Sequence, residues 1–277
     1  MSVNHRPVWA PDDVDIETPS PARMYDYYLD GSHNFAADRE LAEKVLSVWP
    51  DLPHVMRANR AFVRRALTYL VRQGVDQFVD LGSGIPTVGN VHEIVARLDP
   101  MARTVYVDND LVAVSHSRSI LADVPNATIV YADLRDPQSV LGDPALRELI
   151  DLSRPVAVLM FAVLHFVPDD DDPAAILAAY SGATVPGSYL ALSHATADYQ
   201  PERMGEMQDV YRRATAGMNA RSREELAVLL TGAGYELVPP GVVDMIAWKP
   251  DPGSELTDPL GGDLARYSAY SAVGRRL

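Results

Sequence analysis

Three aspartates and two glycines stand where short apolar runs of the sequence end. The segment FVDLGSG contains Asp80, Gly82 and Gly84, VYVDND contains Asp108, and IVYAD ends at Asp133. Glycine lets the backbone approach a ligand closely and adopt a positive φ. A carboxylate accepts hydrogen bonds from hydroxyl and amino groups. Such acids and glycines after successive apolar runs indicate a site for a nucleoside-bearing ligand at one edge of a sheet.

The glycine loop favours one kind of nucleoside ligand over another. A dinucleotide fingerprint has a third glycine that lets the following helix begin at once and face a pyrophosphate. Here Pro86 stands in that neighbourhood, and the first good helix start is Asn90, with Glu93 completing a capping pair. A longer loop and a later helix suit a ligand without a pyrophosphate, such as S-adenosylmethionine.

The three acids have separate expected roles toward that ligand. Asp108 is placed to accept hydrogen bonds from both ribose hydroxyls, and Asp133 to accept one from the adenine amine. Asp80 either orders the glycine loop or reaches the amino group of the methionine part. Arg60, in the helix before the first strand, is a candidate partner for the methionine carboxylate.

Two histidines are candidates for proton transfer. His165, in VLHFVPDD, follows the fourth apolar run, and His194, in LALSHATADY, ends the fifth. Histidine titrates near neutral pH and can act as a general base. The alternative for each is a ring that hydrogen-bonds backbone and shapes a loop. The four adjacent acids Asp169 to Asp172 are expected to cap a helix rather than to bind a metal, and no metal site is predicted.

The N-terminal region is predicted to be a helical cap. Polar, proline-bearing residues 1–20 precede two helical pieces split at Asp30-Gly31-Ser32, and a third helix carries one apolar stripe. The aromatic and amide groups around the split pack the cap onto the core, or they close over the ligand. In the second case Tyr28 and Asn34 contact the cofactor or the acceptor.

The elements that must position these residues alternate between apolar runs and amphipathic stretches after Asp76. We predict strands at about 77–81, 103–107, 128–131, 155–162 and 187–193, and helices near 90–98, 110–122, 137–150, 173–184 and 222–233. The apolar runs lack polar alternation, as in parallel strands covered on both faces. The pattern predicts an α/β fold with a doubly wound, mostly parallel sheet. YELVPPGVVDMIAW is predicted to form an antiparallel hairpin at one edge.

These motifs carry a family resemblance. FVDLGSG, VYVDND, YADLRDP and MFAVLHFVPDD resemble the successive motifs of class I S-adenosylmethionine-dependent methyltransferases. ARMYDYYLDGSHNFAADRE and RANRAF resemble, more narrowly, a bacterial family of S-adenosyl methyltransferases formerly catalogued as a domain of unknown function. The resemblance implies a seven-stranded sheet in the order 3-2-1-4-5-7-6. It also implies that the cofactor is held by a set of strand-end residues with their neighbours: Asp80, Gly82, Ser83, Gly84, Asp108, Asn109, Asp133 and Leu134.

Composition limits the partners. With 24 basic and 38 acidic residues the formal net charge is −14, which disfavours nucleic acid and anionic membranes. The chain has no cysteine, which excludes disulfides, thiolate metal sites and Cys nucleophiles. No secretory signal is recognisable, so we expect a cytoplasmic protein. The family resemblance implies a bacterial one. We expect residues 1–75 to form the arm and cap, 76–250 the S-adenosylmethionine-binding core, and 251–277 a tail packed on that core.

The predicted function is methyl transfer to oxygen or nitrogen of a small-molecule acceptor. Two alternatives stay open. One is an NAD-dependent oxidoreductase, disfavoured by the missing third glycine and by the presence of only two lysines, Lys44 and Lys249. The other is a non-catalytic S-adenosylmethionine-binding protein. The sequence does not identify the acceptor or fix the oligomeric state, for which a homodimer is one candidate.

Overall fold

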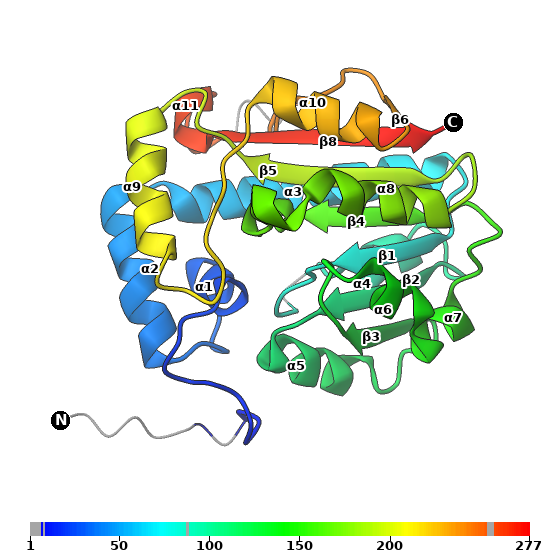
Figure 1. Cartoon of the computed structure of the whole chain (residues 1–277), viewed down its shortest axis with the longest axis horizontal. Helices are drawn as coiled ribbons and strands as arrows, with labels where there is room; N and C mark the ends of the chain where they lie inside the picture. The colour runs from blue at the N-terminus through cyan, green and yellow to red at the C-terminus, as the bar shows by residue number, and fades with distance from the viewer. Residues whose placement is uncertain (1–6, 8, 87–88, 254–257) are drawn as a thin grey trace.

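The computed structural model describes residues 7, 9–86, 89–253 and 258–277. Within these residues eight strands form one sheet in the order β3-β2-β1-β4-β5-β8-β6, and β7 pairs with β8 (Figure 1). The strands are β1 Gln77–Leu81, β2 Arg103–Asp108, β3 Ala127–Tyr131, β4 Ala157–Phe161, β5 Tyr189–Ala195, β6 Tyr235–Leu237, β7 Val243–Asp244 and β8 Ala269–Arg276. The first five are parallel to one another, and β8 is antiparallel to β5.

The predicted doubly wound sheet and its strand order are confirmed, with two differences at the C-terminal side. β8 takes the place of the expected seventh strand, and the two-residue β7 is additional. The hairpin predicted within 235–248 is wrong, because β6 and β7 do not pair with each other but both pair with β8. β8 belongs to the segment 251–277, which is therefore part of the sheet rather than only a tail on it.

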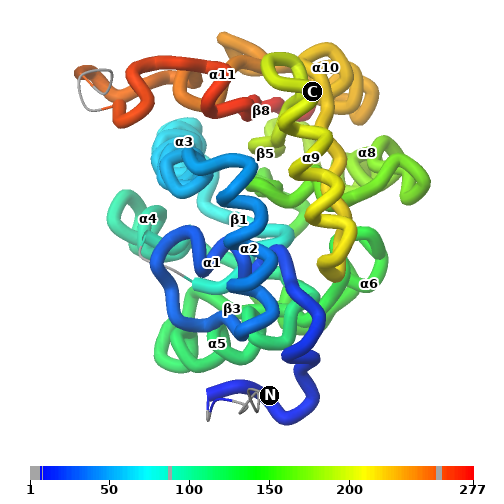
Figure 2. Tube along the Cα trace, turned by 90° about the vertical axis from the view of Figure 1, so that its left-hand side faces the viewer, coloured from blue at the N-terminus to red at the C-terminus, as the bar shows by residue number. Residues whose placement is uncertain are grey.

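Helices cover both faces of the sheet, as buried parallel strands require. Alternate strand residues serve the two faces: Phe78 packs in the core shared with α3, whereas Val79 and Leu81 pack in the core shared with α8 and α10. Figure 2 shows α3 and α4 on one side of the sheet and α6 and α8 on the other. The helices of the core are α3 Leu52–Arg72, α4 Val91–Ala96, α5 Leu111–Leu121, α6 Pro137–Gly142, α7 Pro144–Leu149, α8 Pro173–Ala183 and α10 Arg223–Gly232.

Local chemistry explains where these helices begin. Asn90 and Glu93 form the predicted capping box of α4. The single helix expected at 137–150 is divided into α6 and α7, because Asp143 caps α7 and Pro144 lacks the N–H needed to continue α6. Asp172 caps α8 by accepting a hydrogen bond from the Ala175 N–H.

A helical cap lies at the carboxyl ends of the parallel strands. It consists of α1 Pro21–Tyr28, α2 Ala36–Val48, the first turns of α3 and α9 Pro201–Tyr211. Figure 1 shows α1, α2 and α9 on the side to which the parallel strands point, and in Figure 2 they lie in front of the sheet edge. The first two helices confirm the predicted split around Gly31. The sequence analysis did not predict α9. No helix in the described part of the chain has the length and apolarity needed to cross a membrane.

Candidate functional site

The glycine loop after β1 is held against its neighbours by close contacts. Gly82 has φ 67°, and a Cβ atom there would lie 2.2 Å from Cγ2 of Val163, in the loop after β4. Only glycine therefore fits at this position. Gly84, with φ 66°, donates its N–H to Oδ2 of Asp108 at 2.7 Å. The loop after β1 is thus packed against the loops after β2 and β4.

Asp80 and Asp108, beside these loops, are both buried, and burial raises the pKa of each. The pKa of Asp80 rises to about 7, because desolvation and the nearby Asp108 outweigh the attraction of Arg60. The pKa of Asp108 rises to about 6, although its carboxylate accepts N–H groups from Gly84 and Asp110. Asp80 accepts no hydrogen bond from the described residues. Because a carboxylate has about four acceptor positions, both side chains retain capacity for a ligand.

The third predicted acid lies at the end of β3 in a charged network. Asp133 accepts hydrogen bonds from Nη2 of Arg135 at 2.6 Å and from Nδ2 of Asn109 at 3.2 Å. Burial alone would raise the pKa of Asp133, but the bonds and charge of Arg135 and the bond from Asn109 hold it below its usual value. Leu134 beside it is buried and faces the same space. Asp133 is therefore an ionised acceptor.

A cavity of about 960 Å³ connects these loops with the space beneath the cap. Of the cofactor residues predicted from sequence, all but one line it: Tyr28, Arg60, Asp80, Gly82, Ser83, Gly84, Asp108, Asn109, Asp133 and Leu134. The exception is Asn34, whose amide donates to Asp26 and to the Gly31 carbonyl and so shapes the loop between α1 and α2. This volume is at the upper end for a site that holds one drug-sized ligand.

The two predicted proton-transfer residues both line the cavity, but their environments differ. In His194, Nε2 is 3.1 Å from Nη1 of Arg221, and Nδ1 is 2.7 Å from the Ala195 carbonyl. Arginine only donates, so Nε2 accepts and Nδ1 carries the proton. Burial lowers the pKa of His194 to about 3. This ring has no lone pair left for a substrate, which favours the alternative that it shapes the loop.

His165, in contrast, has a ring nitrogen that is not used in a hydrogen bond with the described residues. Its ring lies 5.4 Å from that of His194, and its Nδ1 is buried with no partner in the described part of the chain. Burial, with the neighbouring His194 and Arg221, holds the pKa of His165 well below its usual value. The imidazole is therefore neutral at neutral pH. A ring with so low a pKa is a weak base.

Sequence reasoning missed two buried arginines that organise the site. Arg23 of α1 contacts Oδ2 of Asp38 at 2.9 Å and Oδ2 of Asp110 at 3.1 Å, and so joins the cap to the loop after β2. Arg221 bonds His194, the carbonyls of the loop after β4 and Oδ1 of Asp169 at 2.7 Å. Arginine-rich composition hid both, since nothing in the sequence distinguishes these two from exposed arginines.

The acidic run Asp169 to Asp172 serves three separate contacts. Asp169 pairs with Arg221, Asp171 pairs with Arg135 at 2.9 Å, and Asp172 caps α8. The side chains point to different partners and do not converge on one ion. Over residues 7, 9–86, 89–253 and 258–277, no group of three or more metal-ligating side chains is found.

An S-adenosylmethionine molecule fits the chemistry of this donor set. The buried Ser83 Oγ has no partner among the described residues, and Asp80, which lines the cavity, accepts no hydrogen bond from them. Asp108 and Asp133 add acceptors for ribose hydroxyls and for an adenine amine. Buried polar groups without partners are rare in native proteins, and a polar ligand explains them here.

Comparison with known proteins agrees with this chemistry. A family model described as S-adenosyl methyltransferase matches residues 7–276. The structure of a DUF574 family protein from Streptomyces avermitilis MA-4680 is 38% identical, with a TM-score of 0.89 over 95% of this chain and 99% of that one. A methyltransferase-like protein from Thermobifida fusca YX is 36% identical, with a TM-score of 0.89 over 98% and 99%. None of the curated protein sequences compared with the chain matches it.

More distant structures share the fold alone. A structure named for S-adenosylmethionine-dependent methyltransferase from Mesorhizobium loti is 16% identical, with a TM-score of 0.53 over 76% of this chain and 96% of that one. The pyocyanin biosynthetic protein PhzM is 17% identical, with a TM-score of 0.50 over 82% and 57%.

Proposed function

This chain belongs to the S-adenosyl methyltransferase family, and we propose that it methylates an oxygen or nitrogen atom of a small-molecule acceptor held beneath the helical cap. The observation that carries this proposal is the continuous cavity of about 960 Å³, which joins the cofactor loops to the space under the cap. The family membership favours S-adenosylmethionine over NAD, so the oxidoreductase alternative is set aside.

The chain's own residues divide the work of binding. Asp108 accepts from the ribose, while Asn109, Asp133 and Leu134 surround the adenine. The backbone of residues 82–84 approaches the methionine part closely, with Asp80 near its amino group. Arg60, whose guanidinium donates to the Gly89 carbonyl, lies near enough to Asp80 to lower its pKa and has further donors for the methionine carboxylate.

S-adenosylmethionine, when bound, supplies a methyl group on a positively charged sulfur. The acceptor atom would bond the methyl carbon with a lone pair, and the sulfur would leave with the electron pair of the broken carbon–sulfur bond. Such an in-line displacement needs chiefly correct positioning and exclusion of water. The cap provides both. The proton of the acceptor leaves to water or to the neutral His165, which is a weak base but can take a proton that methylation of the acceptor atom has made strongly acidic.

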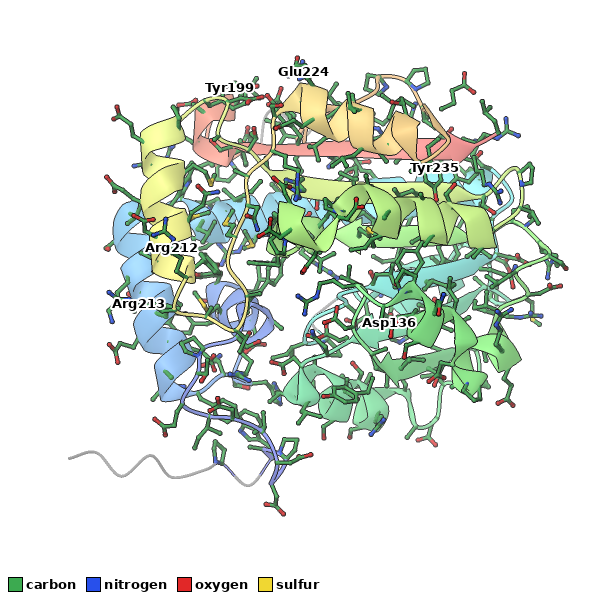
Figure 3. All side chains as sticks on the ribbon, in the orientation of Figure 1. Asp136, Tyr199, Arg212, Arg213, Glu224 and Tyr235 are labelled. Atoms are coloured by element: carbon green, nitrogen blue, oxygen red, sulfur yellow. The ribbon has the colours of Figure 1, made fainter. Side chains whose placement is uncertain are left out.

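The first test is calorimetric titration with S-adenosylmethionine, S-adenosylhomocysteine and NAD. We expect both sulfur ligands to bind and NAD not to bind. Asp108→Asn removes the charge that faces the ribose and is expected to weaken both sulfur ligands by tenfold or more. Asp136→Asn is the matched control, because Asp136 caps α6 by accepting from the Ser139 N–H and does not line the cavity (Figure 3).

Catalysis is tested separately by transfer of an isotope-labelled methyl group to a panel of hydroxyl and amine acceptors. Labelled product from either class supports the proposal. Tight binding of both sulfur ligands with no product on any acceptor would contradict it and favour a protein that only binds S-adenosylmethionine.

A further inference from the structure

The part of the cavity beneath the cap has an unusual lining of methionine. Five of the nine methionines of the chain line the cavity: Met56, Met204, Met207, Met218 and Met245. All but Met56 are buried, and they come from α9, the segment after it and the turn after β7. Thioether side chains are flexible and polarisable, and they make favourable contacts with aromatic rings. A planar aromatic body is the ligand shape that this wall suits.

Formal charge is nearly absent from the same wall. Among the described residues that 20–28, 49–56, 201–219, 245 and 267–269 give to the cavity, only Arg23 and Arg212 are charged, and Arg23 is buried and already paired with Asp38 and Asp110. Arg212 has little to offer a buried ligand. Its side chain is 75% exposed and pairs with Asp209 at 2.6 Å. Figure 3 labels Arg212 at the C-terminal end of α9. A charged ligand body would lose its hydration here without gaining an ion pair.

The wall also carries uncharged polar side chains, and two of them form a buried pair. The hydroxyl groups of Tyr28 and Tyr211 lie 3.3 Å apart, and both side chains are buried and line the cavity. Burial raises the pKa of Tyr211 to about 12 and that of Tyr28 well above its usual value, so both are neutral phenols. Only one of their two protons is used between them. The second has no acceptor among the described residues.

We propose, on the basis of the function proposed above, that the part of the cavity beneath the cap, here called the chamber, binds an uncharged aromatic acceptor that bears a hydroxyl group. The ring of the acceptor lies against the methionines, and its hydroxyl group lies at the Tyr28–Tyr211 pair. The pair completes its hydrogen bonding by donating its free proton to the oxygen of the acceptor. The ring of Phe166, 5.7 Å from that of Tyr211, extends the aromatic contact. The hydroxyl pair thereby selects hydroxyl-bearing aromatics over bare hydrocarbons.

The test measures binding of four matched probes to the full chain saturated with S-adenosylhomocysteine. The probes are 2-naphthol, naphthalene, 2-naphthoate and (2-naphthyl)methylammonium, and equilibrium dialysis gives their dissociation constants. We expect 2-naphthol to bind at least tenfold more tightly than either charged probe. In the Tyr28→Phe/Tyr211→Phe variant, binding of 2-naphthol is expected to weaken about fivefold to tenfold, while naphthalene is unaffected.

Tyr235→Phe is the matched control, since it removes a buried phenol hydroxyl on β6, outside the cavity and far from the cap (Figure 3). It should leave all four dissociation constants unchanged. Equal binding of neutral and charged probes by the unmodified protein overturns the inference, and it does so even if the double variant fails to fold. An equal loss for 2-naphthol and naphthalene also overturns it.

Failure of the underlying function gives a different result. If S-adenosylhomocysteine does not bind the unmodified protein, the proposed methyl transfer is refuted before any probe is added. If S-adenosylhomocysteine binds and the probes show no preference, only the acceptor class is refuted.

Discussion

Asp80 carries a stability cost that the replacement Asp80→Asn should remove. The carboxyl is buried, and its pKa is raised to about 7, chiefly by desolvation. In the unfolded chain its pKa is about 3.9. Between these values the folded state binds more protons than the unfolded state, so stability falls as pH rises from about 4 to about 7. An asparagine does not titrate, so this loss disappears in the variant.

The magnitude follows from the two pKa values. The free energy of unfolding of Asp80→Asn relative to the unmodified protein should increase by about 2–3 kcal/mol between pH 5 and pH 8. Any pH-independent effect of the buried amide cancels in this difference. Urea unfolding of the ligand-free proteins at both pH values measures it. Asp136→Asn, at an exposed helix N-cap, should show a difference close to zero.

The same variant should bind its ligand less well. With Asp80 in the proposed cofactor site, the change removes a negative charge near the ammonium and sulfonium groups of S-adenosylmethionine. We expect at least tenfold weaker binding at pH 8. A stability difference that does not change between pH 5 and pH 8 would refute the raised pKa. Unchanged affinity with the expected stability gain would refute only the ligand contact.

Two further perturbations test how the cap and the glycine loop are held. Arg23→Met leaves Asp38 and Asp110 buried without their shared cation, although each carboxylate keeps two backbone N–H donors. We therefore expect the free energy of unfolding to fall by about 3 kcal/mol and the melting temperature to fall by roughly 6–12 °C. Arg57→Met is the control, because it breaks only the exposed pair with Asp30, and it should change the free energy of unfolding by less than about 1 kcal/mol in thermal unfolding. Equal losses in the two variants would show that the Arg23 network contributes little to stability. Gly82→Ala places a Cβ 2.2 Å from Val163 and should abolish measurable S-adenosylhomocysteine binding, with partial recovery in Gly82→Ala/Val163→Ala; normal binding by the single variant would contradict the packing argument.

The parts of the molecule that were predictable from sequence are those with local signals. Unbroken apolar runs predicted the parallel strands, and the capping pair Asn90 and Glu93 marked the start of α4. Asp108 and Asp133 follow their strands directly, so their place at the sheet edge required only the topology. α9 also carries a usable signal that we did not use, since Met204, Met207 and Tyr211 share one helical face.

The parts that were not predictable depend on pairing across long stretches of chain. β8 lies between β5 and β6, and nothing near residues 269–276 specifies that a C-terminal strand enters between two earlier ones. The role of His194 is set by Arg221, 27 positions later, and the role of Arg23 by Asp110, 87 positions later. Side-chain identity alone therefore made His194 equivalent to His165, although only His165 retains a free nitrogen.

The Arg23 network connects α1 of the cap to the loops that we assign to the cofactor. Oδ2 of Asp110 accepts from Arg23, while its Oδ1 caps α5 and its N–H is bonded to Asp108. Asp108 in turn holds Gly84. A ligand that fixes the Asp108 carboxylate therefore also fixes the anchor of α1, and α1 carries Tyr28 into the chamber where we place the acceptor. By thermodynamic reciprocity, anchoring α1 must strengthen cofactor binding by the same factor by which the bound cofactor stabilises that anchor. This coupling predicts that Arg23→Met, which removes the bonds to Asp38, Asp110 and the Thr18 carbonyl at the cavity wall, weakens binding of S-adenosylhomocysteine.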